Sequence, residues 1–395
     1  MIRRRSGGPA RRPAGPTGPI SRLVRSVPRP EDFTGPSHSP LVAARLGRWL
    51  GVAFGLCFVT GLLSHAVAHP PDWFAWPTRP ASLYRVTQGV HVLSGIAAIP
   101  LLLAKLWSVY PRLFARPPLR RPARLVGHGL ERLAILVLVC AAFFELVTGL
   151  FNVAQSYPWR FFFPAAHYAV AWLAVGALLV HVGVKLPVTR AALASRLDRE
   201  PVPGRRAFLR TAAGATGVAV LATAGVTVPW LRHVSALAWR SAGGPQGVPV
   251  NRTATAAGIV VPVDWRLEIV WAGGRRGLGL ADLAALPQRT GRLPIACVEG
   301  WSAVADWTGV PVVDLLAAVG APAGRPVRVS SLETAGLYAT STLPAVHVAD
   351  PLTLLALRVN GEVLQPDHGY PCRIIAPNRP GVLQTKWVTR LEVLG

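Results

Sequence analysis

The chain has 395 residues, of which 51% are hydrophobic and only 15% charged, and its formal net charge is +24. A mean hydropathy of +0.38 is typical of a membrane protein and excludes an ordinary soluble enzyme. The basic residues stand beside apolar runs and form no stripe with interleaved aromatic residues, so no nucleic-acid partner is expected.

The first segment, residues 1–42, is rich in Arg, Pro and Gly and has no apolar periodicity. Such a segment cannot bury enough apolar surface to become ordered. We therefore predict a disordered, basic tail on the cytoplasmic side.

Five apolar runs follow, each close to the roughly 20 residues that a membrane-spanning helix needs. They lie at about 43–64, 87–110, 128–151, 164–186 and 211–230. The predicted organisation is a four-helix membrane domain (43–186), a cytoplasmic loop (187–210), a fifth transmembrane helix (211–230), a linker (231–249) and a C-terminal domain (250–395).

Lys and Arg residues set the orientation of these helices. The tail and the connections 105–124 and 185–210 hold 23 of them, whereas 65–86 and 151–163 hold three. This positive-inside bias places the N-terminus in the cytoplasm and residues after 230 outside the cell membrane.

Histidines inside the apolar runs predict a cofactor, because a buried imidazole is costly in a bilayer unless it is paired or bound to a metal. His91 and His167 fall at similar depth near the outer face, which suits an axial pair on a b-type haem. His167 and His181 are 14 residues apart, about 21 Å along one helix. The position 14 residues after His91 is Lys105, so an inner haem would lack its usual partner unless His128 substitutes.

Four helices with this histidine spacing resemble the bacterial b-type cytochrome superfamily. The alternative is that the histidines are hydrogen-bonded within the bundle or lie among headgroups. His65 and His69 could be other ligands or contacts of a quinone, and Glu145 could handle protons or only face polar partners.

The segment "RRAFLR" precedes a weakly hydrophobic, Gly- and Ala-rich run and resembles a twin-arginine signal. Arg205, Arg206, Phe208 and Leu209 carry that match. The resemblance implies the twin-arginine export machinery as a partner and a domain that folds around its cofactor before export. An ordinary positive-inside anchor is the alternative.

Residues 250–395 have a different pattern. Short β-branched runs such as "VPVDWRLEIVWAG", "RPVRVSS" and "PCRIIAP" are broken by Gly and Pro, with one helical pattern in "PVVDLLAAVGA". We predict an α+β, mostly β domain. Cys57 and Cys140 lie in apolar runs, so a disulfide framework is not expected.

The most specific motif is "IACVEGWSAVADWTGVPVVDLL". It resembles the sulfite oxidase family of molybdenum enzymes, and within it the periplasmic methionine sulfoxide reductase branch. The family's metal-binding cysteine falls on Cys297, and its neighbours on Glu299, Gly300 and Trp301. The segments "SSLETAGLYATS", "HGYPCR" and "QTKW" continue the match. A thiolate is a soft ligand that suits a redox metal whose other sulfurs come from a pterin.

The resemblance also implies residues that hold the anionic pterin cofactor through cationic groups and backbone donors. They fall here on His368, Arg373, Lys386, Gln384, Thr385, Ser331 (or its neighbour Ser330) and, at the start of the domain, Asn251. Cys372 is expected to be a buried core residue.

Two departures from the family limit the expected chemistry. No basic residue follows Cys297 closely, which argues against sulfite as substrate. An immunoglobulin-like dimerisation module is not expected after Gly395. The sequence thus predicts a membrane-bound molybdopterin oxidoreductase that transfers an oxygen atom to or from a small substrate and exchanges electrons with quinone or another carrier. The alternatives are an enzyme whose helices are only an anchor, or a binding module without redox activity.

Overall fold

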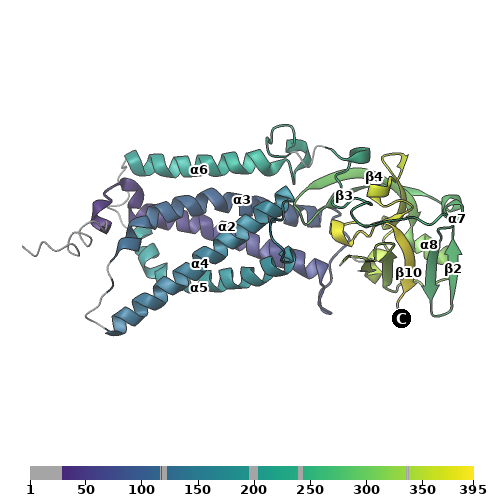
Figure 1. Cartoon of the computed structure of the whole chain (residues 1–395), viewed down its shortest axis with the longest axis horizontal. Helices are drawn as coiled ribbons and strands as arrows, with labels where there is room; N and C mark the ends of the chain where they lie inside the picture. Colours follow the sequence, from purple (N-terminus) through teal and green to yellow (C-terminus); the bar gives the residue numbers. More distant parts are fainter. Residues whose placement is uncertain are drawn as a thin grey trace, which may run out of the picture.

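The computed structural model describes residues 29–395 except 116, 118–121, 195–202, 239–242, 335 and 337. Five long apolar helices come first, followed by a sheet-rich domain at one end of the bundle (Figure 1). The helices are α2 (Pro40–Ala68), α3 (Leu83–Val109), α4 (Pro122–Ala154), α5 (Phe163–Ala194) and α6 (Pro203–Ala224). All five are long and apolar enough to cross a membrane, as the sequence predicts.

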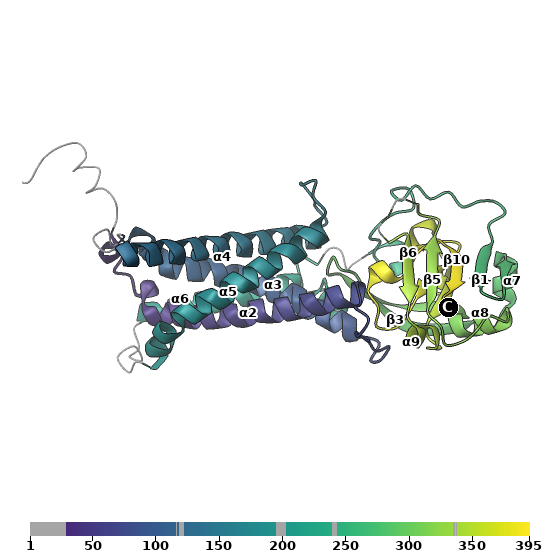
Figure 2. The same cartoon turned by 90° about the horizontal axis from the view of Figure 1, so that it is seen from below.

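The helices run side by side along the long axis of the molecule (Figures 1 and 2). Helix α2 packs along α3, α4 along α5, and α6 lies against α3. Large apolar side chains cover the outside of the bundle, and Leu130, Leu179 and Val218 are each more than 60% exposed. Exposed apolar faces of this extent are expected where lipid replaces water.

The expected disordered tail is wrong for its last part. Residues 1–28 lie outside the described residues, but Pro30–Asp32 and Pro36–His38 form 3-10 turns and Pro40 already starts α2. The ring of Phe33 stacks on Phe114, with centroids 5.7 Å apart. Aromatic contacts of Phe33 and His38 with the end of α3 and the turn after it therefore order a segment whose average composition predicts disorder.

The fifth helix is also shifted from its expected bounds, since it spans Pro203–Ala224 and not 211–230. Pro203 at its first position suits a helix start, and the Arg, Phe and Leu that follow are compatible with a helix, so the arginine pair lies in the first turn. After Ala224 the chain turns sharply. The backbone at Arg232 folds back so close to Gly225 that a Cβ atom there would lie 2.6 Å from the Cα of Arg232, and the helix ends before this turn.

The end of the expected linker, 231–249, belongs to the C-terminal domain. Residues 239–242 lie outside the described residues, but Pro245–Gly247 forms a 3-10 turn. Gln246 Nε2 donates to the carbonyl of Val363 at 2.8 Å, and Gln246 Oε1 accepts from the backbone N–H of Gln365 at 3.0 Å. These contacts fix the entry of the chain into the domain.

The C-terminal domain contains two five-stranded sheets (Figure 2). The first has the order β2-β1-β10-β5-β6, with β1 and β10 parallel; the second has the order β3-β4-β7-β8, with β9 also paired to β7. The strands are β1 (Leu267–Trp271), β2 (Gly274–Leu278), β3 (Arg289–Ala296), β4 (Ser302–Pro311), β5 (Val327–Ser331), β6 (Thr340–Leu343), β7 (Leu354–Val359), β8 (Glu362–Val363), β9 (Arg373–Ile375) and β10 (Val388–Val393).

The expected α+β, mostly β domain is confirmed. The helical pattern "PVVDLLAAVGA" becomes α8 (Val312–Ala318), and two further short helices are present, α7 (Leu280–Ala285) and α9 (Ala345–Val348). Cys372 is fully buried in the core, as expected, and all four cysteines are free.

The loop between α2 and α3 and the start of α3 seat the domain on one end of the bundle. Asn378 uses four polar groups for this contact. Its side chain accepts from the Tyr84 backbone and donates to Pro77 O, both at 2.5 Å; its carbonyl accepts from Trp76 Nε1 at 2.9 Å and its N–H donates to Ala81 O at 3.1 Å. Because Asn378 is only 2% exposed, these bonds replace its contacts with water.

Candidate functional site

Cys297 lies in the hairpin loop between β3 and β4, and this loop points at the helices. Its backbone N–H donates to Trp301 O at 2.9 Å, and the N–H of Gly300 donates to Cys297 O at 3.0 Å. Gly300 has a φ of +93°, a conformation that favours glycine. The tight turn thereby fixes the cysteine, which is 1% exposed, at the edge of the second sheet.

A cavity of about 100 Å³ lies beside Cys297. The structure brings every residue that the sequence assigned to the pterin site to this one cavity, from five separate segments of the domain. They are Asn251, Cys297, Ser331, His368, Arg373, Gln384, Thr385 and Lys386.

Arg373 supplies a buried cation to the cavity. It is 4% exposed and donates to His368 O and Gln384 O, both at 3.2 Å, while its Nε has no hydrogen-bond partner among the described residues. Burial lowers the pKa of Arg373 to about 9. A buried cation without a carboxylate partner is costly, so the cavity is suited to an anion.

Lys386 is the second cation. Its ammonium group donates to Asp367 O at 3.1 Å and to Arg252 O at 2.5 Å, and lies 4.4 Å from the centroid of the Trp387 ring. Burial, with the nearby charge of Arg373, lowers the pKa of Lys386 to about 7. Carbonyl oxygens and an aromatic face hold this cation without neutralising it.

Polar side chains complete the cavity. Ser331 Oγ donates to Lys386 O at 2.8 Å, and Asn251 Oδ1 accepts from Lys386 Nζ at 3.4 Å. His368 Nε2 donates to Pro245 O at 2.6 Å, and burial lowers its pKa, with Arg373 and Lys386 acting in the same direction. The buried Gln384 Oε1 has no partner among the described residues.

The donor set fits a metal that arrives with most of its own ligands. Burial and the neighbouring Glu299 carboxylate raise the pKa of the Cys297 thiol, so a strong cation is needed to make it a thiolate. No group of three or more His, Cys, Asp or Glu residues that could hold a metal ion is found among the described residues. Cys297 therefore suits the single protein ligand of a sulfur-rich metal cofactor.

Three residues of this cavity were missed by the sequence reasoning. Arg252 and Glu333 form an ion pair at its rim, and Tyr338 lines it beside Cys297. Burial, and then Cys297, raise the pKa of Tyr338. Tyr338 stands in the segment "SSLETAGLYATS", so its position in the motif was the available signal.

A second, larger cavity of about 1640 Å³ lies within the membrane helices. It exceeds the roughly 300–1,000 Å³ of an ordinary small-molecule pocket. Its lining is mostly apolar, with a few polar side chains that include His65, His91, Glu145, His167 and His181. It reaches Val298 and Tyr338, so it ends beside the loop that carries Cys297.

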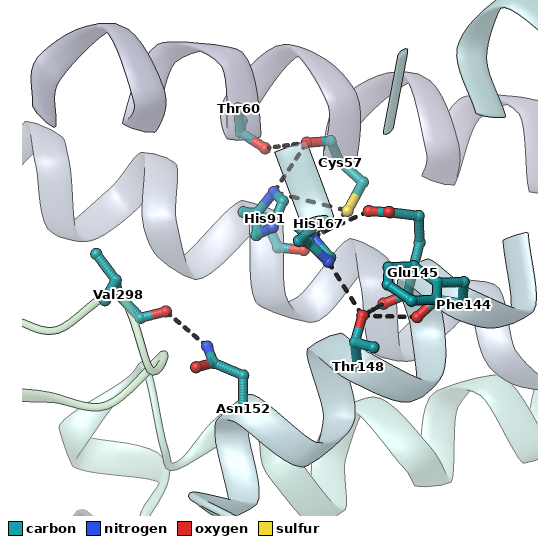
Figure 3. Close-up of polar contacts among 9 residues, drawn as sticks. All are labelled: Cys57, Thr60, His91, Phe144, Glu145, Thr148, Asn152, His167 and Val298. Carbon is teal, nitrogen blue, oxygen red and sulfur yellow. Dashed lines mark hydrogen bonds and ion pairs between the residues drawn. The ribbon is translucent and has the colours of Figure 1, made fainter. Parts of the chain in front are cut away.

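His91 and His167 face one another in this cavity (Figure 3). Their ring centroids are 6.3 Å apart. His91 Nδ1 donates to Cys57 O at 2.8 Å, which leaves its Nε2 available as a ligand. His167 Nδ1 lies 3.3 Å from Thr148 Oγ1, and its Nε2 lies 3.1 Å from Glu145 Oε2.

Gly61 makes room for the His91 ring, since a Cβ atom there would lie 2.9 Å from His91 Cε1. At Gly149 a Cβ atom would lie 3.8 Å from His167 Cε1, which is an ordinary contact distance. The two histidines would both hold a haem iron only if the Glu145 carboxylate turned away from His167 Nε2.

The other candidates within the bundle have different surroundings. His181 and Lys105 line the same cavity, and Lys105 donates to Ala43 O at 2.5 Å. The ring of His65 stacks on Tyr168, with centroids 3.7 Å apart, and on His69 at 4.8 Å. His65 is thus held by aromatic stacking and not beside His91.

Comparison with known proteins places the C-terminal domain. Residues 254–395 match the family model "Oxidoreductase molybdopterin binding domain". The chain is 30% identical to mitochondrial sulfite oxidase of Drosophila melanogaster over 161 residues, which cover 34% of this chain and 28% of that protein. It is 31% identical to the protein-methionine-sulfoxide reductase catalytic subunit MsrP of Burkholderia mallei over 164 residues, which cover 37% and 48%.

Two further similarities concern a putative reductase subunit and a solved structure. A putative protein-methionine-sulfoxide reductase subunit YedZ1 of Azospira oryzae is 33% identical over 114 residues, which cover 29% of this chain and 42% of that protein. The sulfane dehydrogenase SoxCD of Paracoccus pantotrophus is 26% identical with a TM-score of 0.31, covering 34% and 39%. The chain spans less than half the length of each of these proteins. Residues 254–395 are a molybdopterin-binding oxidoreductase domain.

Proposed function

We propose that the protein is a membrane-bound molybdopterin-dependent oxidoreductase that transfers an oxygen atom to or from a small substrate outside the cytoplasmic membrane. The observation that carries this proposal is the cavity beside Cys297, where the buried Arg373 and the half-buried Lys386 have no carboxylate ion-pair partner among the described residues. An anionic pterin with a metal at the thiolate satisfies the cavity, the cations and the cysteine together.

The domain's own residues would bind and orient the cofactor. Arg373 and Lys386 would hold its anionic tail, Gln384 and Thr385 its polar edge, and Cys297 the molybdenum. The bound metal would supply the two-electron oxygen-atom transfer. The apolar and aromatic wall around Cys297, which includes the buried Trp301, would exclude water from the thiolate.

The helical module would carry electrons between the molybdenum and a quinone or another carrier. The support for this part is the paired geometry of His91 and His167, with the cavity that extends from them to Val298 beside Cys297. A haem b held by these two histidines would supply a one-electron relay in an apolar surround. His181 farther along α5 is a further candidate ligand.

The twin-arginine segment would direct export of the folded, cofactor-loaded domain by the twin-arginine machinery. The domain lies at one end of the five helices, and the described arginines Arg205, Arg206 and Arg210 lie toward the other end of α6 (Figure 1). With the positive-inside bias, this arrangement supports a cytoplasmic N-terminus and an extracytoplasmic C-terminal domain.

The test is metal analysis together with a reduced-minus-oxidised optical spectrum of detergent-purified protein from a host that makes molybdopterin. Molybdenum together with the α-band of a b-type haem is the expected result. Molybdenum without a haem band would reduce the helices to an anchor. Protein with neither would leave a binding module on the same fold.

A further inference from the structure

Two helices of the bundle contact the C-terminal domain at one carbonyl group, that of Val298. This residue follows the metal-binding Cys297. Gln88 Nε2 of α3 donates to Val298 O at 3.3 Å, and Asn152 Nδ2 of α4 donates to it at 3.0 Å (Figure 3). Two side chains from two helices thus saturate the acceptor capacity of a single carbonyl.

Neighbouring contacts hold the rest of the loop. Gln155, which follows α4, hydrogen-bonds to the carboxylate of Glu299, and that carboxylate accepts from Trp301 Nε1 at 3.1 Å. A Cβ atom on Gly300 would lie 3.0 Å from Val92 Cγ2 and 3.4 Å from Val153 Cγ2. The loop therefore fits the ends of α3 and α4 closely enough that one added methyl group would disturb it.

The Asn152 amide is itself oriented. Tyr157 Oη donates to Asn152 Oδ1 at 2.9 Å, which turns the Nδ2 donor toward Val298. Neutral polar side chains within apolar helices are costly unless they are paired. Gln88 is 5% exposed and Asn152 8% exposed, and the amide N–H group of each is satisfied by the loop carbonyl.

Gln88 precedes His91 by three residues on α3, so the two share a helix face. Asn152 follows Thr148 by four residues on α4, and Thr148 Oγ1 lies 3.3 Å from His167 Nδ1 of α5. Helix α3 therefore carries His91, and α4 carries a contact of His167, each one turn away from a side chain that holds the Cys297 loop.

We propose that Gln88 and Asn152 are positioning residues for the metal-binding cysteine: through the Val298 carbonyl, the membrane helices set the orientation of the Cys297 thiolate and its separation from the histidine pair. This inference rests on the proposed function, because it concerns the metal at Cys297. It makes the membrane domain a structural part of the active site and not only its electron supply.

The experiment compares wild-type protein with the Gln88→Leu/Asn152→Leu double variant and with Thr87→Val as a matched control. Thr87 is also a polar residue of α3, but its hydroxyl donates only to Tyr84 O of its own helix, at 3.0 Å. Each protein is purified with its cofactors, and three quantities are measured: molybdenum content, the electron paramagnetic resonance spectrum of the half-reduced metal, and the rate of electron transfer between the haem and the metal.

The double variant is expected to keep its molybdenum, to show a changed resonance spectrum, and to lose about tenfold or more of the electron-transfer rate, whereas Thr87→Val matches the wild type. The single variants keep one bond each, are expected to give intermediate spectra, and decide the question if the double variant does not fold. A wild-type spectrum and rate in the double variant would overturn the inference, as would a loss of rate that only follows a loss of molybdenum.

The same measurements distinguish failure of the proposed function from failure of this inference. Wild-type protein without molybdenum would overturn the proposed function and this inference with it. Wild-type protein with molybdenum but no haem would overturn the electron route alone, and the resonance spectra would then decide whether Gln88 and Asn152 position the thiolate.

Discussion

The two halves of the molecule prepare their sites in different ways. The C-terminal domain has a small cavity of about 100 Å³, lined by the buried Arg373, the half-buried Lys386 and polar groups on short loops. The bundle has a mostly apolar cavity of about 1640 Å³, lined along helices that bury few of their own residues. Protein interiors are normally close-packed, so both cavities are suited to a ligand. The small cavity would select its ligand by charge, and the large cavity would hold a large apolar ligand.

The largest effect is expected for Cys297→Ser. A serine oxygen is a harder donor than sulfur, and its hydroxyl is a far weaker acid than a thiol, so it would not replace the thiolate on the metal. Turnover should fall to background while the protein stays in the membrane fraction. Cys140→Ser, which changes an exposed cysteine of α4, is the control and should keep full activity. Full turnover in Cys297→Ser would refute the assignment of the site.

The second comparison concerns the bundle alone. His91→Leu and His167→Leu should each abolish most of the haem α-band, because each removes one of the two imidazoles, while the molybdenum content stays within about twofold. His69→Leu, on the outer end of α2, should keep the band. An unchanged optical spectrum in both histidine variants would show that His91 and His167 are not haem ligands.

Charge selection in the small cavity is tested by Arg373→Met. Hydrogen bonds to charged groups contribute about 1.5–3 kcal/mol, so cofactor retention should fall about tenfold or more. The cofactor-free variant should be as stable as the wild type or more stable, since a buried cation has been removed. Arg390→Met changes an exposed arginine, paired with Glu268 at 3.5 Å, and should keep its molybdenum. Equal retention in both variants would contradict the role of Arg373.

The smallest effect is a pH dependence at Lys386. Its pKa of about 7 in the folded protein lies below 10.5 in the unfolded chain, so the unfolded chain binds more protons between these values and the cofactor-free protein gains stability as the pH rises through that window. An anion prefers the protonated ammonium, so cofactor loading should weaken above about pH 7, by at most tenfold per unit.

Reconstitution of the cofactor-free protein between about pH 6 and pH 9 measures this trend. Lys386→Arg keeps its charge throughout that range and should flatten the profile. A wild-type profile without slope would show that the charge of Lys386 does not contribute to cofactor binding.

The sequence was most informative where the signal is local. Twenty-residue apolar runs predicted the five helices, and the motif around Cys297 singled out the cysteine that lines the small cavity. The bounds of the fifth helix were wrong because they were drawn from hydropathy alone. Hydropathy does not indicate that Arg205 and Arg206 extend the helix or that the chain turns at Gly225.

Contacts between distant segments could not be predicted. Gln88 and Asn152 were visible as polar residues in apolar runs, which was a usable signal, but nothing in the chain shows that they meet at Val298, 210 and 146 residues away. The bonds of Asn378 to Pro77 and Tyr84 join segments about 300 residues apart, and the segment "PCRIIAP" that precedes it gives no sign of these partners.

The bonds of Asn378 also bear on the order in which the protein is made. Asn378 makes four hydrogen bonds from one buried position. A domain that arrives tilted or incompletely folded would leave several of these polar groups unpaired, which costs free energy. Under the proposed topology the helices insert first and the loaded domain follows. The loop between α2 and α3 would then serve as a checkpoint at the end of export, where only a correctly folded domain comes to rest.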